Sequence, residues 1–212
     1  MDTIVFYNFY SNIELVPKIL NLAEYYIQHG YKVCLLDFSL TCPRLYYYDS
    51  DIQSKINLGM VDYITSFTEE EGVSNIEGYI VKIKESLTLI PVGNTQKSYF
   101  NKAQLLNWRK LFYTDIEDEW HCGVAFFLNF KEQIKYELKS DILLILSTSG
   151  ATEEAGVCLT LLADTIMFYR SNFSDDKVIK DIEDRIIQGC KDRDLYNFKL
   201  RDVRIKIIDT VF

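Results

Sequence analysis

The side chains best placed for chemistry are an acid and a group of hydroxyls that follow two apolar runs. Asp37 ends the run at 32–37, and Ser147 ends the run at 142–147, where Thr148 and Ser149 follow. Asp37 could bind a metal ion, but the acid expected beside it is missing, so we predict that it caps a nearby loop or helix. The hydroxyls lack a G-x-S-x-G elbow and are expected to satisfy backbone groups at a loop–helix junction, as is Thr152.

His121 and Cys122 are a second pair that could act as base and nucleophile. Adjacent residues on a helix or strand point in different directions, and the sequence identifies no acid or amide that would orient the imidazole. We therefore predict that this pair packs at the start of a helix. The five cysteines are widely spaced without a C-x-x-C pair, which indicates reduced thiols rather than a zinc site. No catalytic residue and no metal site are predicted.

The elements that would position these residues alternate between short apolar strands and amphipathic helices. Strands are predicted at 3–7, 32–37, 87–92, 142–147, 165–169 and 203–208. The last alternates between apolar and charged residues and is expected at a sheet edge. Helices are predicted at 14–29, 102–113, 123–139 and 175–189, and the capping-box spacing from Ser66 to Glu69, with the acids up to Glu71, predicts a helix start. The order predicts an α/β fold with a doubly wound, mostly parallel sheet, in a single domain spanning 1–212.

The first strand–helix turn is where a doubly wound sheet usually binds phosphate. Such a cradle needs glycines, whose backbone N–H groups can approach phosphate, and a lysine that neutralises it. Here the turn at 9–16 reads FYSNIELV and has no Gly, Lys or Arg. The Glu14 carboxylate would repel phosphate and has capping-box spacing with Ser11, although Pro17 favours a helix that begins nearer Glu14. The turn is predicted not to bind a nucleotide.

Several segments, in order along the chain, resemble ParA/MinD-type P-loop ATPases of the branch whose phosphate loop reads K-G-G-V-G-R-T. Residues 35–43 (LLDFSLTCP) resemble the branch's L-V-D-x-D-x-x-x-P motif. Residues 59–63 (GMVDY) and 89–93 (LIPVG) resemble its G-L-x-D-Y and L-x-P-x-G segments. Residues 144–153 (LILSTSGATE) resemble L-I-D-S-R-T-G-x-T-E, and LADT at 162–165 matches the segment before the next strand. The resemblance covers about residues 3–170 and implies a P-loop NTPase-like sheet with helices on both faces.

The chain departs from this pattern at the positions that would bind the nucleotide. K-G-G-V-G-R-T corresponds here to Tyr10, Ser11, Asn12, Ile13, Glu14, Leu15 and Val16. Tyrosine thus stands in place of the signature lysine, and valine in place of the magnesium-binding hydroxyl. Asp37 remains, but Ser39 replaces the second aspartate of its motif, and Leu146 and Thr148 replace an aspartate and an arginine. The resemblance therefore implies a catalytically inactive pseudo-ATPase without a cofactor.

Such a chain is expected to serve as a protein–protein interaction or scaffolding subunit. The K-G-G-V-G-R branch occurs widely in bacteria beside genes of signalling or defence systems, which suggests a role there by association. Relatives in this ATPase class dimerise across the nucleotide face, so that face is the first candidate for a homodimer or a hetero-complex. The alternative is a divergent enzyme that binds a nucleotide or metabolite at the strand ends through Asp37, Ser39, Ser147 and Ser149.

Charge and hydropathy limit the class of partner. The formal net charge of −8 disfavours nucleic acid, despite a small basic run formed by Lys199, Arg201, Arg204 and Lys206. No stretch approaches 18 uninterrupted apolar residues, and the N-terminus lacks a signal-peptide pattern. We therefore expect a cytoplasmic protein whose partner is another protein, neither a nucleic acid nor a membrane.

Tyr10 and the consecutive Tyr46, Tyr47 and Tyr48 are the predicted contact surface. Both groups follow predicted strands and are expected at the same end of the sheet. Tyrosine is enriched at interfaces because its ring is apolar and its hydroxyl is polar. The 15 Tyr and 13 Phe of the chain could equally reflect the codon usage of an AT-rich genome.

We predict that the double change Tyr46→Ala/Tyr48→Ala weakens association at least tenfold, since truncating an interfacial tyrosine costs about 1–3 kcal/mol. Co-purification followed by light scattering measures it. The control is Lys180→Ala/Asp184→Ala, on a helix expected far from this surface. Intact association in the tyrosine variant, with an unchanged circular dichroism spectrum, would move the interface elsewhere.

Overall fold

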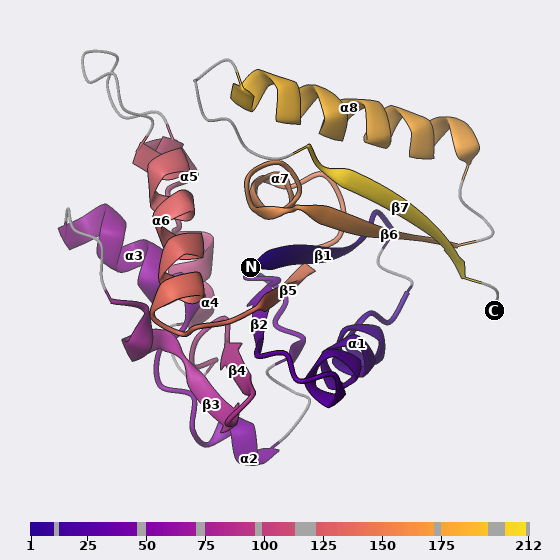
Figure 1. Cartoon of the computed structure of the whole chain (residues 1–212). Helices are drawn as coiled ribbons and strands as arrows, with labels where there is room; N and C mark the ends of the chain where they lie inside the picture. The colour runs from indigo at the N-terminus through magenta and orange to yellow at the C-terminus, as the bar shows by residue number, and fades with distance from the viewer. Residues whose placement is uncertain are drawn as a thin grey trace.

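The central feature of the protein is a seven-stranded sheet, seen in a computed structural model that describes residues 1–10, 13–45, 50–70, 75–95, 99–112, 122–171, 175–194 and 202–210. The strands lie in the order β3-β4-β2-β5-β1-β6-β7 (Figure 1). All neighbouring pairs are parallel except β3 and β4. The strands are β1 (Asp2–Asn8), β2 (Val33–Phe38), β3 (Val81–Lys84), β4 (Leu87–Ile90), β5 (Ile142–Ser147), β6 (Thr165–Ser171) and β7 (Arg204–Thr210).

The central strands are apolar because both of their faces are covered. Every residue of β2 and β5 is buried, and only the first residue of β1 is exposed. A strand covered on both faces needs no polar side, so its sequence loses the alternation of a half-exposed strand. β7, in contrast, is exposed or half-buried along its whole length and forms one sheet edge, as predicted. The predicted doubly wound, mostly parallel sheet is confirmed.

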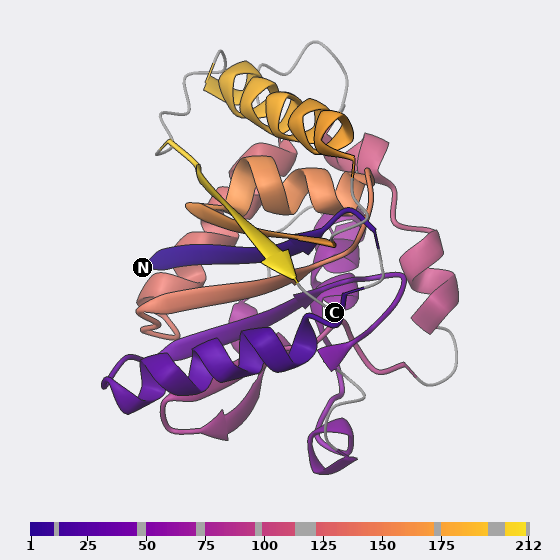
Figure 2. The same cartoon turned by 90° about the vertical axis from the view of Figure 1, so that its right-hand side faces the viewer.

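Helices cover the two faces unequally (Figures 1 and 2). On one face, α1 (Val16–Gln28) buries Ile19 and Ala23 against apolar side chains of β1, β2 and β5. The other face carries α3 (Met60–Glu70), α6 (Cys122–Tyr136), the π-helix η3 (Val157–Leu162) and α8 (Asp176–Asp194). The short elements are α2 (Ser50–Gln53), the 3-10 helix η2 (Ile76–Tyr79), α4 (Tyr99–Gln104), α5 (Trp108–Phe112) and α7 (Glu153–Gly156). No helix in these described ranges is both long and apolar enough to cross a membrane.

The predicted helix start at Ser66 is wrong. Ser66 lies inside α3, and its hydroxyl donates to the carbonyl of Tyr63 (3.0 Å) in the preceding turn, a common alternative use of a helical serine. The helix begins six residues earlier, where the Asp62 carboxylate accepts the Gly59 N–H (3.1 Å). Glu69 accordingly lies in the last turn of α3 rather than the first. Capping-box spacing alone therefore does not locate a helix end.

Other helices match the predicted ranges with shifted ends. The helix predicted at 102–113 is two short helices, α4 and α5. The helix predicted at 175–189 continues to Asp194. The antiparallel edge strand β3 was not among the predicted strands. The helix predicted at 14–29 begins at Val16 with Pro17 in its first turn, which agrees with the expectation from Pro17.

Candidate functional site

The carboxyl ends of β1 and β5 form the place where a doubly wound sheet usually opens a crevice. The two strands are neighbours in the sheet, but their connections leave on opposite faces. β1 continues into α1 on one face, and β5 continues into α7 and η3 on the other (Figure 2). Ligands of such sheets bind at this point because the diverging loops leave space between them.

Here the side chain of Asn8 closes that point. The Asn8 amide nitrogen donates to the carbonyl of Tyr10 (2.8 Å) and lies 3.3 Å from that of Ile13. Its oxygen accepts the Ser149 hydroxyl (2.7 Å), which comes from the loop after β5. Asn8 is fully buried. One amide therefore holds the loops after β1 and β5 together, and two carbonyls of the first turn face inward toward it.

One backbone N–H group at the N-terminus of α1 is bound by a side chain of the chain itself, and the next residue has none to offer. The Glu14 carboxylate accepts the Val16 N–H (3.0 Å), and Pro17 has no N–H. Val16 is buried against the core, whereas the Tyr10 side chain is 41% exposed. Ser11 and Asn12 lie outside the described residues, so the predicted pairing of Ser11 with Glu14 stays a prediction.

Asp37, at the end of β2, organises the loop that follows it. Its carboxylate accepts the backbone N–H groups of Ser39 (3.1 Å), Arg44 (3.0 Å) and Leu45 (2.8 Å), together with the Ser39 hydroxyl. Burial raises the pKa of the fully buried Asp37 carboxyl, and these hydrogen bonds oppose the rise. The prediction that Asp37 caps a loop is confirmed.

Two of the hydroxyls after β5, those of Ser147 and Thr152, bond to nearby backbone as predicted, whereas the prediction is wrong for Ser149, whose hydroxyl bonds to the side chains of Asn8 and Arg44. Ser147 donates to the carbonyl of Thr148 (3.2 Å), and Thr152 accepts the Ala155 N–H (3.1 Å) as the N-cap of α7. Leu146, at the family's aspartate position, is fully buried between β1 and β2. Thr148, at the arginine position, is 8% exposed.

Arg44, like Asn8, is a residue of this edge that sequence reasoning missed. Its guanidinium donates to the Ser149 hydroxyl (3.0 Å), 105 positions away, while its backbone N–H binds Asp37. No local pattern marks such a contact, although the Pro43-Arg44-Leu45 segment directly follows the resembling second motif. Tyr46, Tyr47, Tyr48 and His121 lie outside the described residues. In the ranges that are described, no three His, Cys, Asp or Glu side chains form a group that could hold a metal ion.

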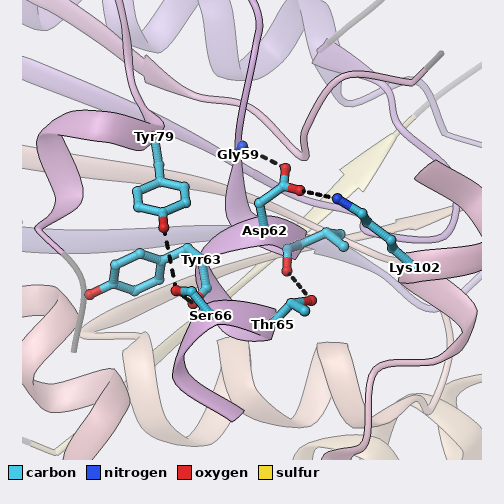
Figure 3. A network of polar contacts seen from close by, with 8 residues as sticks. Gly59, Asp62, Tyr63, Thr65, Ser66, Tyr79 and Lys102 are labelled. Carbon is cyan, nitrogen blue, oxygen red and sulfur yellow. Dashed lines mark hydrogen bonds and ion pairs between the residues drawn. The ribbon is translucent and has the colours of Figure 1, made fainter. Parts of the chain in front are cut away.

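Two of the resembling motifs meet beside this edge, around Gly59. The backbone N–H of Met60 donates to the carbonyl of Pro91 (2.8 Å), and that of Val61 donates to the carbonyl of Val92 (2.9 Å). The carboxylate of Asp62 accepts the Gly59 N–H and binds the Lys102 ammonium (3.0 Å) of α4 (Figure 3). A Cβ atom on Gly59 would lie 2.3 Å from the carbonyl oxygen of Pro91, so only glycine permits this backbone approach.

Comparison with known proteins supports the fold. No protein-family model matches this chain, and no curated protein matches its sequence. A cobyrinic acid a,c-diamide synthase from Mycobacterium smegmatis superposes with a TM-score of 0.66 at 11% identity, covering 100% of this chain and 73% of that chain. A plasmid partition protein from Borrelia burgdorferi gives 0.62 at 17% identity, covering 100% and 79%. MinD from Aquifex aeolicus gives 0.58 at 15% identity, covering 99% and 69%.

These structures define the class: the chain has the fold of the ParA/MinD-type P-loop ATPases. This agrees with the fold that the sequence motifs imply. Identities this low show a shared architecture and leave activity open, because one fold supports many chemistries.

We predict that Gly59→Ala lowers the free energy of unfolding by about 2–4 kcal/mol, because the atoms that the new methyl group meets belong to the backbone. Urea denaturation measures it. Gly78→Ala in η2 is the matched control, since a Cβ there meets nothing within 4 Å. A loss below about 1 kcal/mol for Gly59→Ala would show that the two motifs separate easily.

Glu154, in the first turn of α7, provides a test by pH. It is 6% exposed, and burial together with the neighbouring Glu153 raises its pKa from 4.5 to about 7. The folded protein therefore binds more protons than the unfolded chain between pH 4.5 and about 7. Stability from this group is present below pH 4.5 and is lost as the pH rises through about 7.

In the parent, this titration lowers the free energy of unfolding between pH 5 and pH 8. Glu154→Gln removes the titration, so its free energy of unfolding at pH 8, relative to pH 5, should be higher than the parent's by on the order of 1 kcal/mol. Urea denaturation at both pH values measures this difference. Glu132→Gln, a change of an exposed glutamate on α6, is the control and should leave it unaltered. An equal difference in both variants would show that Glu154 titrates as it does in the unfolded chain.

Proposed function

We propose that this chain is a catalytically inactive pseudo-ATPase of the ParA/MinD-type fold that works by binding another protein. The observation that carries the proposal is a set of contacts in the described part of the first turn, where Asn8 binds carbonyls of Tyr10 and Ile13 and Glu14 binds the Val16 N–H. A phosphate cradle needs N–H groups that converge on an empty space. Here carbonyls converge on an amide, and a carboxylate occupies the helix N-terminus.

The residues at the other nucleotide positions do not fit a magnesium-bound phosphate. Magnesium takes oxygen ligands from hydroxyls, carboxylates and phosphates. Val16 and Leu146, at the positions that the resemblance assigns to magnesium and catalysis, are apolar and buried. Asp37 is present, but its oxygens already accept four hydrogen bonds from the β2 loop. These features support the loss of hydrolysis.

The same contacts argue against the alternative, a divergent enzyme at the strand ends. Such a site would use Asp37, Ser39, Ser147 and Ser149. Each of these side chains already binds groups within the chain, and Ser149 bridges Asn8 and Arg44. A ligand would have to replace buried hydrogen bonds that are well formed, which costs free energy.

A protein partner is supported by the fold class and by the exposed edge. One similar structure is described as the MinC:MinD cell division protein complex of Aquifex aeolicus, which matches at 19% identity and a TM-score of 0.57. At the carboxyl edge of this chain's sheet, Tyr10 is 41% exposed and packs edge-on against Phe9. An exposed tyrosine packed on a half-buried phenylalanine supports a contact surface, and the net charge of −8 favours a protein over nucleic acid.

We predict that the protein does not bind ATP. Isothermal titration calorimetry with millimolar Mg-ATP should show no heat of binding, because the carbonyls of Tyr10 and Ile13 point toward the Asn8 amide and the Glu14 carboxylate stands at the start of α1. A dissociation constant below about 100 μM, or about −5.5 kcal/mol, would contradict the proposal. Glu14→Ala should remain unable to bind, since removing the carboxylate does not turn N–H groups inward. Binding by that variant alone would show that the carboxylate, rather than the loop conformation, excludes the nucleotide.

A further inference from the structure

A cavity of about 590 Å³ lies between the end of β1, the α7–η3 segment and α8, the long helix beside α7 in Figure 1. Its wall is mostly apolar and is formed by Tyr7, Phe9, Leu159, Val178, Ile182 and Ile186. Tyr7 is buried at one end of it. The cavity meets the first turn at Phe9, and no other described residue of that turn lines it. Its volume and apolar lining are those of a small-molecule site.

The glycine in its wall keeps this space open. Gly156 has helical backbone angles (φ −54°, ψ −49°), where any residue fits, and a Cβ there would meet nothing within 4 Å. Glycine in a helix is destabilising relative to alanine, so a larger residue would both fill the cavity and favour the helix. Gly189 on α8 differs, because a Cβ there would lie 2.9 Å from the Thr160 methyl group. Gly189 is thus explained by packing, and Gly156 is not.

The backbone beside Gly156 is also unusual. The six residues that follow form a π-helix, η3, and its Leu159 and Thr160 line the cavity. π-Helical turns are rare and occur often at functional sites, because they cost backbone stability. Gly156 and the π-helix that follows it are both less stable than a regular α-helix, and both border the cavity.

The polar groups of the cavity indicate the charge of its ligand. The Tyr7 hydroxyl donates to the carbonyl of Gly150 (3.0 Å), so its oxygen can still accept a hydrogen bond from a ligand. Glu153, Asp181 and Arg185 line the rim, and Arg185 binds Asp181 (2.9 Å). Two carboxylates and one guanidinium leave a net negative rim, which disfavours anions.

We propose that this cavity binds an uncharged, ring-containing small molecule that donates a hydrogen bond to the Tyr7 hydroxyl oxygen. The apolar wall takes the ring system, and the rim excludes phosphates and carboxylates. This inference does not rest on the pseudo-ATPase proposal. Phe9, at the start of the first turn, lines the cavity, but the residues in the contacts of Asn8 and Glu14 that carry that proposal do not.

The test uses N-phenylnaphthylamine, an uncharged aromatic amine whose fluorescence rises in apolar surroundings, and its anionic relative anilinonaphthalene sulfonate. The amine should bind the full chain saturably at one site, and the sulfonate about tenfold more weakly or worse. Gly156→Leu should weaken binding of the amine by tenfold or more, and Gly156→Ala by less. Gly78→Leu is the control. A Cβ at Gly78 also meets no atom within 4 Å, but Gly78 belongs to η2 and does not line the cavity. It should leave binding unchanged.

Stability gives an independent measure of the same space. Gly156→Ala should raise the melting temperature by about 2–4 °C, because the helix gains and nothing clashes. If Gly156→Leu fails to fold, the alanine variant decides the question. The proposal is overturned if the amine does not bind, if the sulfonate binds equally well, or if a folded Gly156→Leu protein binds the amine like the parent. Loss of a protein–protein association in Gly156→Leu, with no binding of the amine, would assign the cavity to a partner's side chain instead.

Discussion

The buried side chain of Asn8 is the interaction on which the carboxyl edge of this sheet depends. Its amide binds the first turn, its oxygen binds Ser149, and Ser149 in turn accepts the Arg44 guanidinium. Arg44 is held through its backbone N–H by Asp37. This one path joins the loops after β1, β5 and β2. Each group on it is wholly or partly buried, so removing one partner would leave others without hydrogen bonds at a cost of about 1–3 kcal/mol each.

Such a path gives the edge a stability that needs no bound ligand. Among the buried side-chain polar atoms of the described residues, only the hydroxyl oxygen of Thr3 lacks a partner, and Thr3 lies at the opposite end of β1. In an edge that holds a nucleotide, the groups that bind phosphate or magnesium are not already hydrogen-bonded to one another. The internal saturation of this edge is the physical basis for proposing a binding protein rather than an ATPase.

The sequence predicts most of the sheet because burial leaves a simple signal. β1, β2 and β5 each contain a run of at least four apolar residues, and the alternating β7 is an edge strand. β3 was missed because it has only four residues, of which Val81 and Ile83 alternate with lysines. The start of α3 was missed because Ser66 and Glu69 have the spacing of a capping box, whereas the helix begins at Met60 and its first turn is capped by the Asp62 carboxylate. The contact from Arg44 to Ser149 could not be predicted, since it joins segments that only the folded sheet brings together.

The residues that match the ATPase pattern and those that depart from it have different structural roles. Gly59, Asp62 and the 91–93 segment match, and they hold backbone against backbone beside β4, where a methyl group would already clash. Tyr10, Val16 and Leu146 depart, and the resemblance assigns their positions to the nucleotide. Gly59 and its partners act on the fold whether or not a ligand is bound. A chain that presents the same surface without a ligand needs the residues that shape the fold, such as Gly59 and Asp62, and does not need the residues that bind a nucleotide. That division supports a role in which the shape of the fold, rather than its chemistry, is what a partner recognises.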